Sequence, residues 1–295
     1  MMQLGLVRSE STRKGVVLCL LSMMVLAAQD AITKVLVQDM AVVQFVMVRY
    51  WVFAAFAILY VHFNGGITSA LRTQHGWLQP LRSIMAVAEI AIFTLALRYL
   101  GLAEAHSLFA AFPLIAIALA GPLLGEHVGL RRGLAVLAGF IGTLIILRPG
   151  MGVFKPEALI VLTAALTFAL YNIVTRFVSH QDGFNTNMVY LAVIGCIAAT
   201  LFGIPAWREP TMDEWVLMGV LSVTGIAGHV LLIKALHYAP ASVLQPFNYS
   251  LLVFATIVGI VIFEEFPDFW TIAGASLVVA SGLYAIAIDR LRRKR

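Results

Sequence analysis

Ten apolar runs, each about twenty residues long, follow one another through almost the whole chain. A helix needs about 20 consecutive apolar residues to cross the hydrocarbon core of a bilayer, so every run is long enough to span a membrane. The predicted spans are 14–38, 41–63, 77–99, 103–125, 130–148, 156–179, 186–205, 214–237, 241–263 and 269–289. Their connectors are mostly short, which makes neighbouring helices antiparallel. We therefore predict an all-α membrane protein with ten transmembrane helices.

The composition supports lipid as the solvent for most of the surface. Of the 295 residues, 61% are hydrophobic and 12% are charged. Soluble domains average about 45–50% apolar and about 25% charged residues, so a soluble domain and a disordered chain are both excluded. The two cysteines, Cys19 and Cys196, lie inside apolar runs and are predicted to pack as small hydrophobic residues. No spacing of cysteine, histidine or carboxylate residues is typical of a metal site, so we expect neither a metal nor a cofactor.

Basic residues in the connectors predict the orientation, because positively charged loops resist translocation. An even number of spans places both termini on one side, which carries eleven such residues against four on the other. The eleven are Arg8, Arg13, Lys14, Arg72, Arg131, Arg132, Arg290, Arg292, Arg293, Lys294 and Arg295, and the four are Arg98, Arg148, Lys155 and Arg208. We predict a cytoplasmic N-terminal segment at 1–13 and a basic cytoplasmic tail at 290–295. The tail favours anionic membrane lipid as a partner and gives little support to nucleic acid.

The two halves of the chain are similar to each other. Residues 96–99 (Ala-Leu-Arg-Tyr) align with 235–238 (Ala-Leu-His-Tyr) at an offset of 139. Nearer the start of each half the offset is 142, and residues 29–34 align with 171–176. These matches include polar and aromatic side chains, which chance similarity between apolar helices does not explain. We infer an internal duplication.

The offset of 139 also relates Glu126 to Glu265, near the end of each half. Each half holds five helices, an odd number, so the second copy enters the membrane from the opposite side and is inverted. We predict two inverted five-helix repeats, 14–148 and 149–289, around a central cavity. Inverted repeats around a site at the middle of the membrane are typical of secondary transporters.

A set of motifs marks the first half, and part of it returns in the second half. In the first half they are Lys34, Arg49, 96–106 (Ala-Leu-Arg-Tyr-Leu-Gly-Leu-Ala-Glu-Ala-His), Pro113, 124–126 (Leu-Gly-Glu) and 133–142 (Gly-Leu-Ala-Val-Leu-Ala-Gly-Phe-Ile-Gly). The second copy extends from Ala235 through Glu265 to Gly282. This set resembles the EamA repeat of the drug/metabolite transporter superfamily, over nearly the whole chain.

The resemblance implies a ten-helix secondary transporter of a small-molecule substrate and no enzymatic activity. In length and pattern the chain is similar to bacterial inner-membrane exporters of aromatic and other amino acids, which implies a multi-pass protein of that membrane. One departure is Leu252, which stands where Pro113 would map, while Pro246 lies earlier in the same span. Because proline breaks or kinks a helix, we expect the kinks of the two halves to be displaced from each other.

The first span carries the polar residues Gln29, Asp30 and Lys34. An ionisable group in a span costs about 2.5–3.5 kcal/mol. Asp30 and Lys34 are four residues apart on one helix face, so we expect a structural ion pair between them. The alternative is that one of them is a gate or a proton-linked group that changes its partner during transport. Arg49 in the second span is expected to reach Asp30 or the membrane interface.

Glu89 lies in the middle of the third predicted span, where no neighbouring turn supplies a basic partner. It is a candidate for proton coupling or for binding the ammonium group of an amino acid. The alternative is a protonated side chain that is hydrogen-bonded to another helix. His229 falls one position from the image of Glu89 at the offset of 139. We expect it to be either a hydrogen-bonding core residue or part of the substrate pathway.

In the second half, Asn172 and Arg176 correspond to Asp30 and Lys34. Asparagine replaces the aspartate, so Arg176 needs another partner. A loop carboxylate, a lipid phosphate and a substrate carboxylate are the alternatives.

Gln245 and Asn248 flank Pro246 in the ninth predicted span, and Phe109 precedes Pro113 in the fourth. A proline inside a span frees a backbone carbonyl, which is tolerated only where the backbone lines a cavity or is buried in protein. We therefore predict that these two spans line the substrate pathway. Three tyrosines complete the predicted walls: Tyr99, Tyr171 and Tyr238. For each tyrosine the alternative is packing at the membrane interface.

Small residues such as Gly139, Gly142 and Gly274 recur in the fifth and tenth spans and permit close helix contact. We assign these spans to scaffolding or to the seam of a homodimer, so the protein is predicted to be a monomer or a homodimer.

The favoured function is export of small amphipathic metabolites, most of all amino acids including aromatic ones, by alternating access. A multidrug or nucleotide-sugar carrier on the same scaffold is the alternative, although Lys34 and Arg176 are few basic groups for a phosphorylated substrate. An intramembrane enzyme is less favoured, because the chain has no nucleophile elbow, no His-Glu-x-x-His helix and no aspartate cluster. No Walker A loop is present, so ATP is not expected to drive transport directly.

Overall fold

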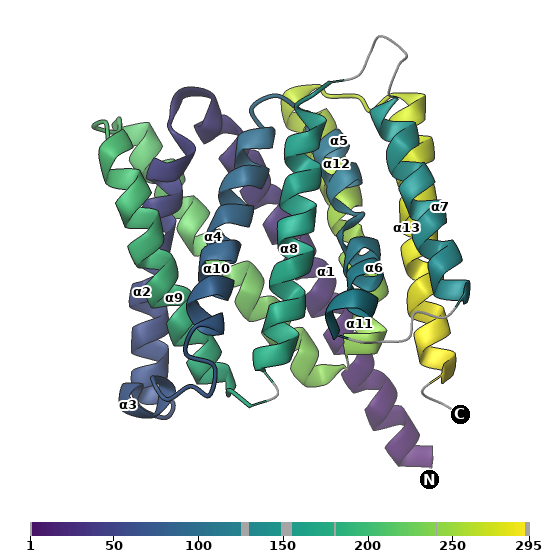
Figure 1. Ribbon diagram of the computed structural model, residues 1–295, viewed down its shortest axis with the longest axis horizontal. Helices are drawn as coiled ribbons and strands as arrows, with labels where there is room; N and C mark the ends of the chain where they lie inside the picture. Colours follow the sequence, from purple (N-terminus) through teal and green to yellow (C-terminus); the bar gives the residue numbers. More distant parts are fainter. Residues whose placement is uncertain (1, 125–129, 149–154, 180, 240, 293–295) are drawn as a thin grey trace.

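The computed structural model describes residues 2–124, 130–148, 155–179, 181–239 and 241–292. It is a bundle of upright helices (Figure 1). Within these residues, nine helical stretches are long and apolar enough to cross a membrane, and Gly133–Leu147 forms a shorter apolar helix. These ten stretches lie at the ten predicted spans, so the prediction of an all-α membrane protein with ten transmembrane helices is confirmed.

The first half contains α1 (Met2–Asp39), α2 (Val42–Phe63), the short α3 (Ile67–Ala70), α4 (Leu78–Ala96), α5 (Leu102–Phe109), α6 (Phe112–Leu124) and α7 (Leu130–Leu147). The second half contains α8 (Ala158–Val178), α9 (Phe184–Gly203), the 3₁₀ turn η1 (Ile204–Ala206), α10 (Met212–Tyr238), α11 (Ala241–Asn248), α12 (Ser250–Phe263) and α13 (Phe269–Arg292). α1 begins well before the predicted start of the first span at residue 14. Its apolar portion is Thr12–Asp39.

The fourth and ninth spans are each broken into two helices, α5 and α6 in the first half and α11 and α12 in the second. Pro113 explains the first break, because it has no N–H to donate to the Phe109 carbonyl and its ring crowds that carbonyl. The second break falls at Tyr249, which is the image of Ala110 at the offset of 139. The expectation of displaced kinks is therefore wrong: the prolines are displaced, but the breaks are equivalent.

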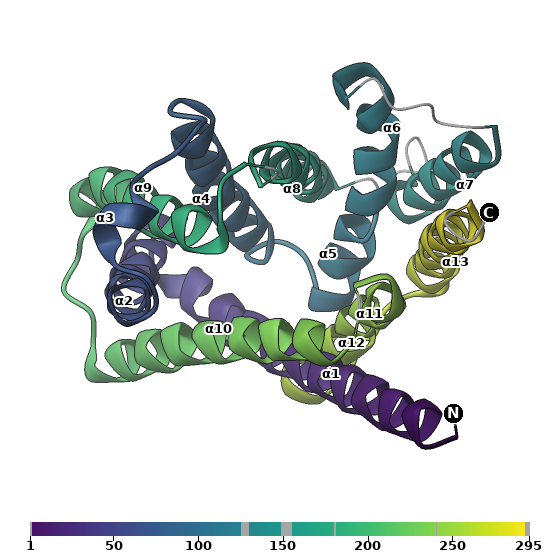
Figure 2. The ribbon, with the colours of Figure 1, turned by 90° about the horizontal axis from the view of Figure 1, so that it is seen from below.

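The pattern of helix contacts stays the same when each helix of one half is exchanged for its counterpart in the other half. The counterparts are α1 and α8, α2 and α9, α4 and α10, α5/α6 and α11/α12, and α7 and α13. α1 packs on α10 and α12, just as α8 packs on α4 and α6, while α2 packs on α9 and α7 on α13. Exchanging the halves maps this set of contacts onto itself, as the prediction of inverted repeats requires. Viewed along the helices, the spans surround a central region (Figure 2).

α1 begins and α13 ends at the same face of the bundle, the lower face in Figure 1. We call this the terminal face and the other one the distal face. The connectors between α1 and α2, α4 and α5, and α12 and α13 lie at the distal face.

Side-chain hydrogen bonds define two helix ends at the distal face. Arg98 donates from Nε to the carbonyl of Val37 at 2.7 Å and from Nη2 to that of Met40 at 3.3 Å, so it caps the C-terminal carbonyls of α1. At the start of α10, Thr211 Oγ1 accepts from the Glu214 amide at 3.3 Å, while Glu214 accepts from the Thr211 amide at 2.8 Å. This reciprocal pair is a capping box, which satisfies amides that the first turn of a helix leaves free.

The small residues of the fifth and tenth spans bring α7 and α13 together within the chain. A Cβ atom added at Gly142 would lie 2.8 Å from the carbonyl oxygen of Gly274, and one at Gly274 would lie 2.6 Å from that of Gly142. These residues therefore belong to a scaffold seam inside one molecule, the first of the two roles predicted for them.

A buried polar network joins α4, α8 and α9 near the terminal face. Asp182, in the connector between α8 and α9, accepts hydrogen bonds from Thr73 Oγ1 at 2.5 Å, the Gln74 amide at 2.9 Å and Gln79 Nε2 at 2.8 Å. Gln79 Oε1 in turn accepts from Arg82 Nη2 at 2.9 Å. Arg82 is 2% exposed and its Nη2 also donates to the Asn187 carbonyl at 2.7 Å. The network thus satisfies a guanidinium that would be very costly to bury alone.

Replacing Gly142 by alanine should destabilise the protein by about 1–3 kcal/mol, because the new methyl group would overpack the seam. The matched control is Gly133→Ala in the same helix, where an added Cβ meets nothing within 4 Å. Alanine is the better helix former by about 1 kcal/mol, so the control should be neutral or stabilising. Thermal unfolding of the purified variants measures both. Equal effects of the two substitutions would show that the seam is not tightly packed.

The Asp182 carboxyl should make stability depend on pH. Burial tends to raise its pKa, but the hydrogen bonds from Thr73, Gln74 and Gln79 outweigh burial and hold the pKa below its usual value of 3.8. The stabilising effect of the Asp182 carboxylate is therefore complete at pH values above 3.8. It is lost as the pH falls through the lower pKa of the folded state. We expect Asp182→Asn to lower the Tm near neutral pH, and the difference from wild type to shrink at strongly acidic pH. A difference that grows with acid would contradict the assignment.

Candidate substrate pathway

The two charged residues of the first span pair with other helices rather than with each other. Asp30 Oδ2 lies 3.0 Å from Nε2 of His106 in α5. Lys34 Nζ lies 2.6 Å from Oε1 of Glu265, which follows α12. The expected ion pair between Asp30 and Lys34 is therefore wrong. Partners on neighbouring helices face α1 at each level and replace the local contact.

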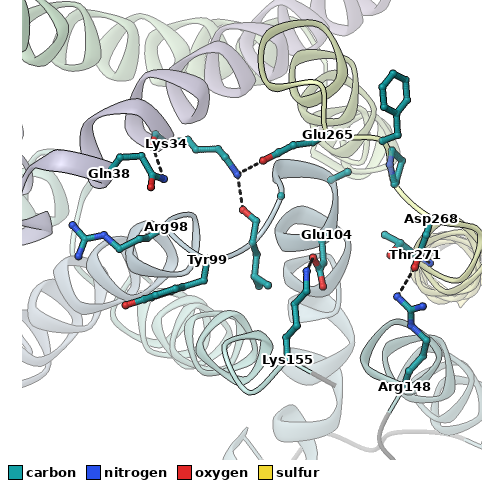
Figure 3. Close-up of a pocket in the computed structure, with 15 residues that line it drawn as sticks. Lys34, Gln38, Arg98, Tyr99, Glu104, Arg148, Lys155, Glu265, Asp268 and Thr271 are labelled. Atoms are coloured by element: carbon teal, nitrogen blue, oxygen red, sulfur yellow. Dashed lines mark hydrogen bonds and ion pairs between the residues drawn. The ribbon is translucent and has the colours of Figure 1, made fainter. Parts of the chain in front are cut away.

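Lys34 and Glu265 form a latch at the distal face, together with the backbone where α5 begins. Lys34 Nζ donates to the Leu100 carbonyl at 2.6 Å, and Glu265 Oε2 accepts from the Leu102 amide at 3.0 Å. The side chain of Lys34 is 9% exposed and that of Glu265 is 29% exposed. Figure 3 shows the Lys34 ammonium pointing at the Glu265 carboxylate across the space between α1 and α12. The latch therefore ties the first half of the chain to the second.

The latch forms one wall of a polar pocket of about 500 Å³ at the distal face, which we call the vestibule (Figure 3). Two further ion pairs line it: Lys155 with Glu104 at 3.0 Å and Arg148 with Asp268 at 2.5 Å. Burial tends to raise the pKa of Asp268, but hydrogen bonds from Thr271 and Arg148 outweigh it and hold this pKa below its usual value. The vestibule is therefore charged at neutral pH and is suited to polar solutes.

Tyr99 also lines the vestibule, in the connector between α4 and α5. It is 51% exposed and lies at a helix end. Tyr238 ends α10 near the terminal face and is 42% exposed. The two tyrosines therefore lie at opposite ends of the bundle, which agrees with the interface alternative for both.

A second group of polar side chains lies inside the bundle, at the level of the middle turns of α1, α2, α4 and α10. Glu89 lies within electrostatic range of both Arg49 and Asp30, and Arg49 lies within range of His229. His229 Nδ1 lies 2.8 Å from the carbonyl oxygen of Gly225. Three of the predicted site residues, Asp30, Glu89 and His229, are thus associated here with Arg49, and the four residues come from four different helices.

Gln29 faces the same place. A Cβ atom added at Gly225 would lie 2.8 Å from Gln29 Oε1, 3.5 Å from Arg49 Nη2 and 3.6 Å from Arg49 Nε. Gln29 is 4% exposed, and within the described part of the chain its Oε1 has no hydrogen-bond partner. A buried acceptor without a partner is unusual, because it loses water and gains nothing in return.

Aromatic rings form a continuous wall that meets this polar group at His106, the partner of Asp30, whose ring centroid lies 5.2 Å from that of Phe93. The ring centroids of Phe109 and Phe168 are 5.5 Å apart, those of Phe112 and Phe168 are 4.8 Å apart, and those of Phe168 and Tyr171 are 5.9 Å apart. Phe93 extends the wall, 4.9 Å from Phe109. The wall combines residues of α5 and α6 with residues of α8, so it crosses from one half of the chain to the other.

The remaining predicted residues lie at other places. Asn172 Nδ2 donates to the Phe168 carbonyl of its own helix at 2.7 Å. Arg176 is exposed in the last turn of α8, towards the terminal face. Asn248 Oδ1 accepts from Cys19 Sγ at 3.4 Å. The side chain of Gln245 and the whole of Glu126 lie outside the described residues.

His106 and Arg82 are among the buried polar residues that the sequence analysis missed. The signal for Arg82 was its presence in the predicted span 77–99, one turn after Gln79. His106 belongs to a recurring motif, but nothing in its spacing indicates Asp30 as a partner. Arg82 also faces the aromatic wall, with its guanidinium 5.8 Å from the Tyr171 ring centroid.

The sequence profile of the EamA-like transporter family matches residues 13–148 and again residues 155–287. The chain belongs to the EamA-like transporter family. Within this family it is similar to curated transporters from several bacteria. Over 276 residues it is 26% identical to the S-adenosylmethionine uptake transporter of Rickettsia prowazekii, covering 94% of this chain and 93% of that protein.

Two further relatives carry other substrates. The riboflavin transporter of Vibrio cholerae is 32% identical over 233 residues, covering 78% of each chain. The pseudopaline exporter CntI of Pseudomonas aeruginosa is 26% identical over 219 residues, covering 72% of this chain and 75% of that protein. A solved crystal structure with 19% identity superposes with a TM-score of 0.62, covering 96% of this chain and 98% of that one, which supports the fold alone. This EamA protein is therefore a multi-pass membrane transporter of a small molecule.

The latch predicts a specific pattern of energetic coupling. Lys34→Met and Glu265→Gln should each lower the Tm, because each leaves a mostly buried partner without its counter-charge. The double variant should lose less unfolding free energy than the two single variants lose together, and the difference, the coupling energy, should be about 0.5–3 kcal/mol. The matched control is Lys155 with Glu104, a more exposed pair, for which we expect a coupling of at most about 1 kcal/mol. Additive losses at the latch would contradict this account.

Proposed function

We propose that this EamA protein is a secondary transporter that moves small amphipathic metabolites with an amino-acid head group across the bacterial inner membrane by alternating access. The substrates include amino acids, aromatic ones among them, and larger amino-acid derivatives. The observation that supports this most is the aromatic wall beside the mid-membrane charges. Together they offer an apolar surface for a ring or chain and polar groups for a charged end.

The position of the aromatic wall between the halves supports alternating access. Phe109 and Phe112 belong to the broken fourth span, while Phe168 and Tyr171 belong to α8 of the second half. A ring bound at this wall touches both halves, so its contacts change when one half rocks against the other. A solute can bias a conformational equilibrium only through such differential contacts.

The names of the relatives support the substrate class. S-adenosylmethionine carries an amino-acid head group and an adenine ring, and one relative takes up this compound. Another relative exports pseudopaline, so both directions of transport occur among similar proteins. We propose export for this chain, on its resemblance to amino-acid exporters, with the cytoplasm at the terminal face as the basic residues there favour.

A carrier of riboflavin-like compounds is the second candidate. A flat, three-ring system would stack well on Phe168 and Tyr171, and the riboflavin transporter of Vibrio cholerae is 32% identical to this chain. Such a substrate would use the aromatic wall but has no amino-acid head group.

The test is uptake into proteoliposomes of purified protein with labelled L-tryptophan, S-adenosylmethionine, riboflavin and UDP-glucose. We expect saturable uptake of the first two compounds. Phe168→Ala should raise KM roughly tenfold, since one aromatic contact is worth about 0.5–1.5 kcal/mol beyond its buried area. Phe63→Ala is the control, because Phe63 is 79% exposed at the end of α2. Uptake of riboflavin alone would favour the second candidate, and uptake of UDP-glucose alone would contradict both.

A further inference from the structure

Arg49 and Glu89 are a basic and an acidic residue inside the bundle, yet no ion pair or hydrogen bond joins either to a side chain in the described part of the protein. Every N–O distance between the two is thus greater than 4.0 Å, although they interact electrostatically. Two charged residues in the second half of α1 do have such partners, since Asp30 pairs with His106 and Lys34 pairs with Glu265. Arg49 and Glu89 are the exceptions in a region where partners are otherwise supplied.

The side chains of Arg49 and Glu89 are incompletely covered by protein. Arg49 and Glu89 are half-buried, while their electrostatic neighbours lie on α1, α2, α4 and α10. Gly225 of α10 faces the Arg49 guanidinium with no side chain of its own. We infer that the exposed part of each of these two side chains faces the interior of the bundle.

The buried acceptor of Gln29 is a second, independent sign of a ligand. Its Oε1 has no partner and faces Gly225, the same place as the Arg49 guanidinium. In the described part of the protein, Gln29 Oε1, Arg49 and Glu89 thus all lack a partner. A ligand with a hydrogen-bond donor, a negative charge and a positive charge would supply all three.

We propose that Arg49 and Glu89 bind the two charges of a zwitterionic head group, with the carboxylate on Arg49 and the ammonium on Glu89. The guanidinium presents paired N–H donors that match the two oxygens of a carboxylate. The ammonium of the ligand has three donors, and Gln29 Oε1 accepts one that Glu89 leaves free. This assignment deepens the proposed function and rests on it.

The balance of charge gives this site its selectivity. When the ammonium group of the ligand holds Glu89 in its ionised form, Arg49 and Glu89 together are neutral, as is an α-amino acid, so the occupied site carries no net charge in a region of low dielectric. A compound with only one of the two charges would leave either Arg49 or Glu89 desolvated and unpaired, which is costly. The site should therefore prefer the zwitterion to amines and to carboxylates of the same shape.

The experiment measures equilibrium binding to the purified full-length protein of three matched probes: L-tryptophan, tryptamine without the carboxylate, and indole-3-propionate without the ammonium. S-adenosylmethionine and its decarboxylated derivative form a second matched pair. We expect wild type to bind each zwitterion at least about tenfold more tightly than its analogues, the range of hydrogen bonds to charged groups. L-Tryptophan and S-adenosylmethionine are also tested for uptake in the same preparation.

The variants separate the two ends of the ligand. Arg49→Gln should weaken binding of the zwitterion and of indole-3-propionate about tenfold or more, and leave tryptamine within about twofold. Glu89→Gln should do the reverse, weakening the zwitterion and tryptamine and sparing indole-3-propionate. Arg49→Lys and Glu89→Asp keep the charges and should retain the preference for the zwitterion. Arg72→Gln, in the exposed connector after α3, is the matched control and should change nothing.

Size-exclusion profiles and Tm values identify variants that fail to fold. If Arg49→Gln or Glu89→Gln fails to fold, the proposal is tested by the ligand preference of Arg49→Lys or Glu89→Asp at the same position. Equal losses for all three indole probes in folded Arg49→Gln and Glu89→Gln would overturn the proposal. So would wild-type protein that transports riboflavin but shows no preference for either zwitterion, and the transport function would then still stand. Failure of wild type to bind or transport any compound of the panel would overturn the proposed function as well.

Discussion

Hydrocarbon offers no hydrogen bonds, and this constraint decides most of the architecture of the chain. Every polar group inside the bundle needs a partner from the protein. Hydroxyl groups such as Thr33 Oγ1 find it in their own helix, whereas the long charged side chains also reach other parts of the chain. Lys34 therefore reaches Glu265, and Arg82 reaches Gln79 and the backbone of Asn187. The contact of Lys34 with Glu265 and the contact of Arg82 with Asn187 each join the first half of the chain to the second. The same contacts that satisfy polar groups also fix how the inverted halves fit together.

Three groups without partners lie together at the proposed site. Among the described residues, Arg49 and Glu89 have no ion pair and Gln29 Oε1 has no hydrogen-bond partner. Beside them, an aromatic wall bridges α5, α6 and α8. The structure thus divides its polar residues into those that hold helices together and those that face the space between them. A transporter needs both, since a site that is fully satisfied without its substrate has little to gain from binding it.

Much of the fold was predictable from the sequence, whereas the pairing inside it was not. Hydrophobic runs fix where helices cross the membrane, and an odd number of spans in each repeat fixes the inversion. The spacing of Asp30 and Lys34 shows that they share a face of α1, but it carries no information on which helix meets that face. His106 and Glu265 meet it at different levels. The different positions of Pro113 and Pro246 led to the wrong prediction of displaced kinks. The equivalent breaks at Ala110 and Tyr249 depend on packing between the halves as well as on local sequence.

Alternating access requires that the inverted halves open the pathway at one face as they close it at the other. Spin-label distance measurements in proteoliposomes test this with two pairs of exposed positions in a cysteine-free background. Gln38 and Phe266 report on the distal face, and Leu123 and Ser179 report on the terminal face. On adding a transported substrate, we expect one distance distribution to lengthen while the other shortens. Two distances that stay fixed, or that change in the same direction, during transport would contradict the account.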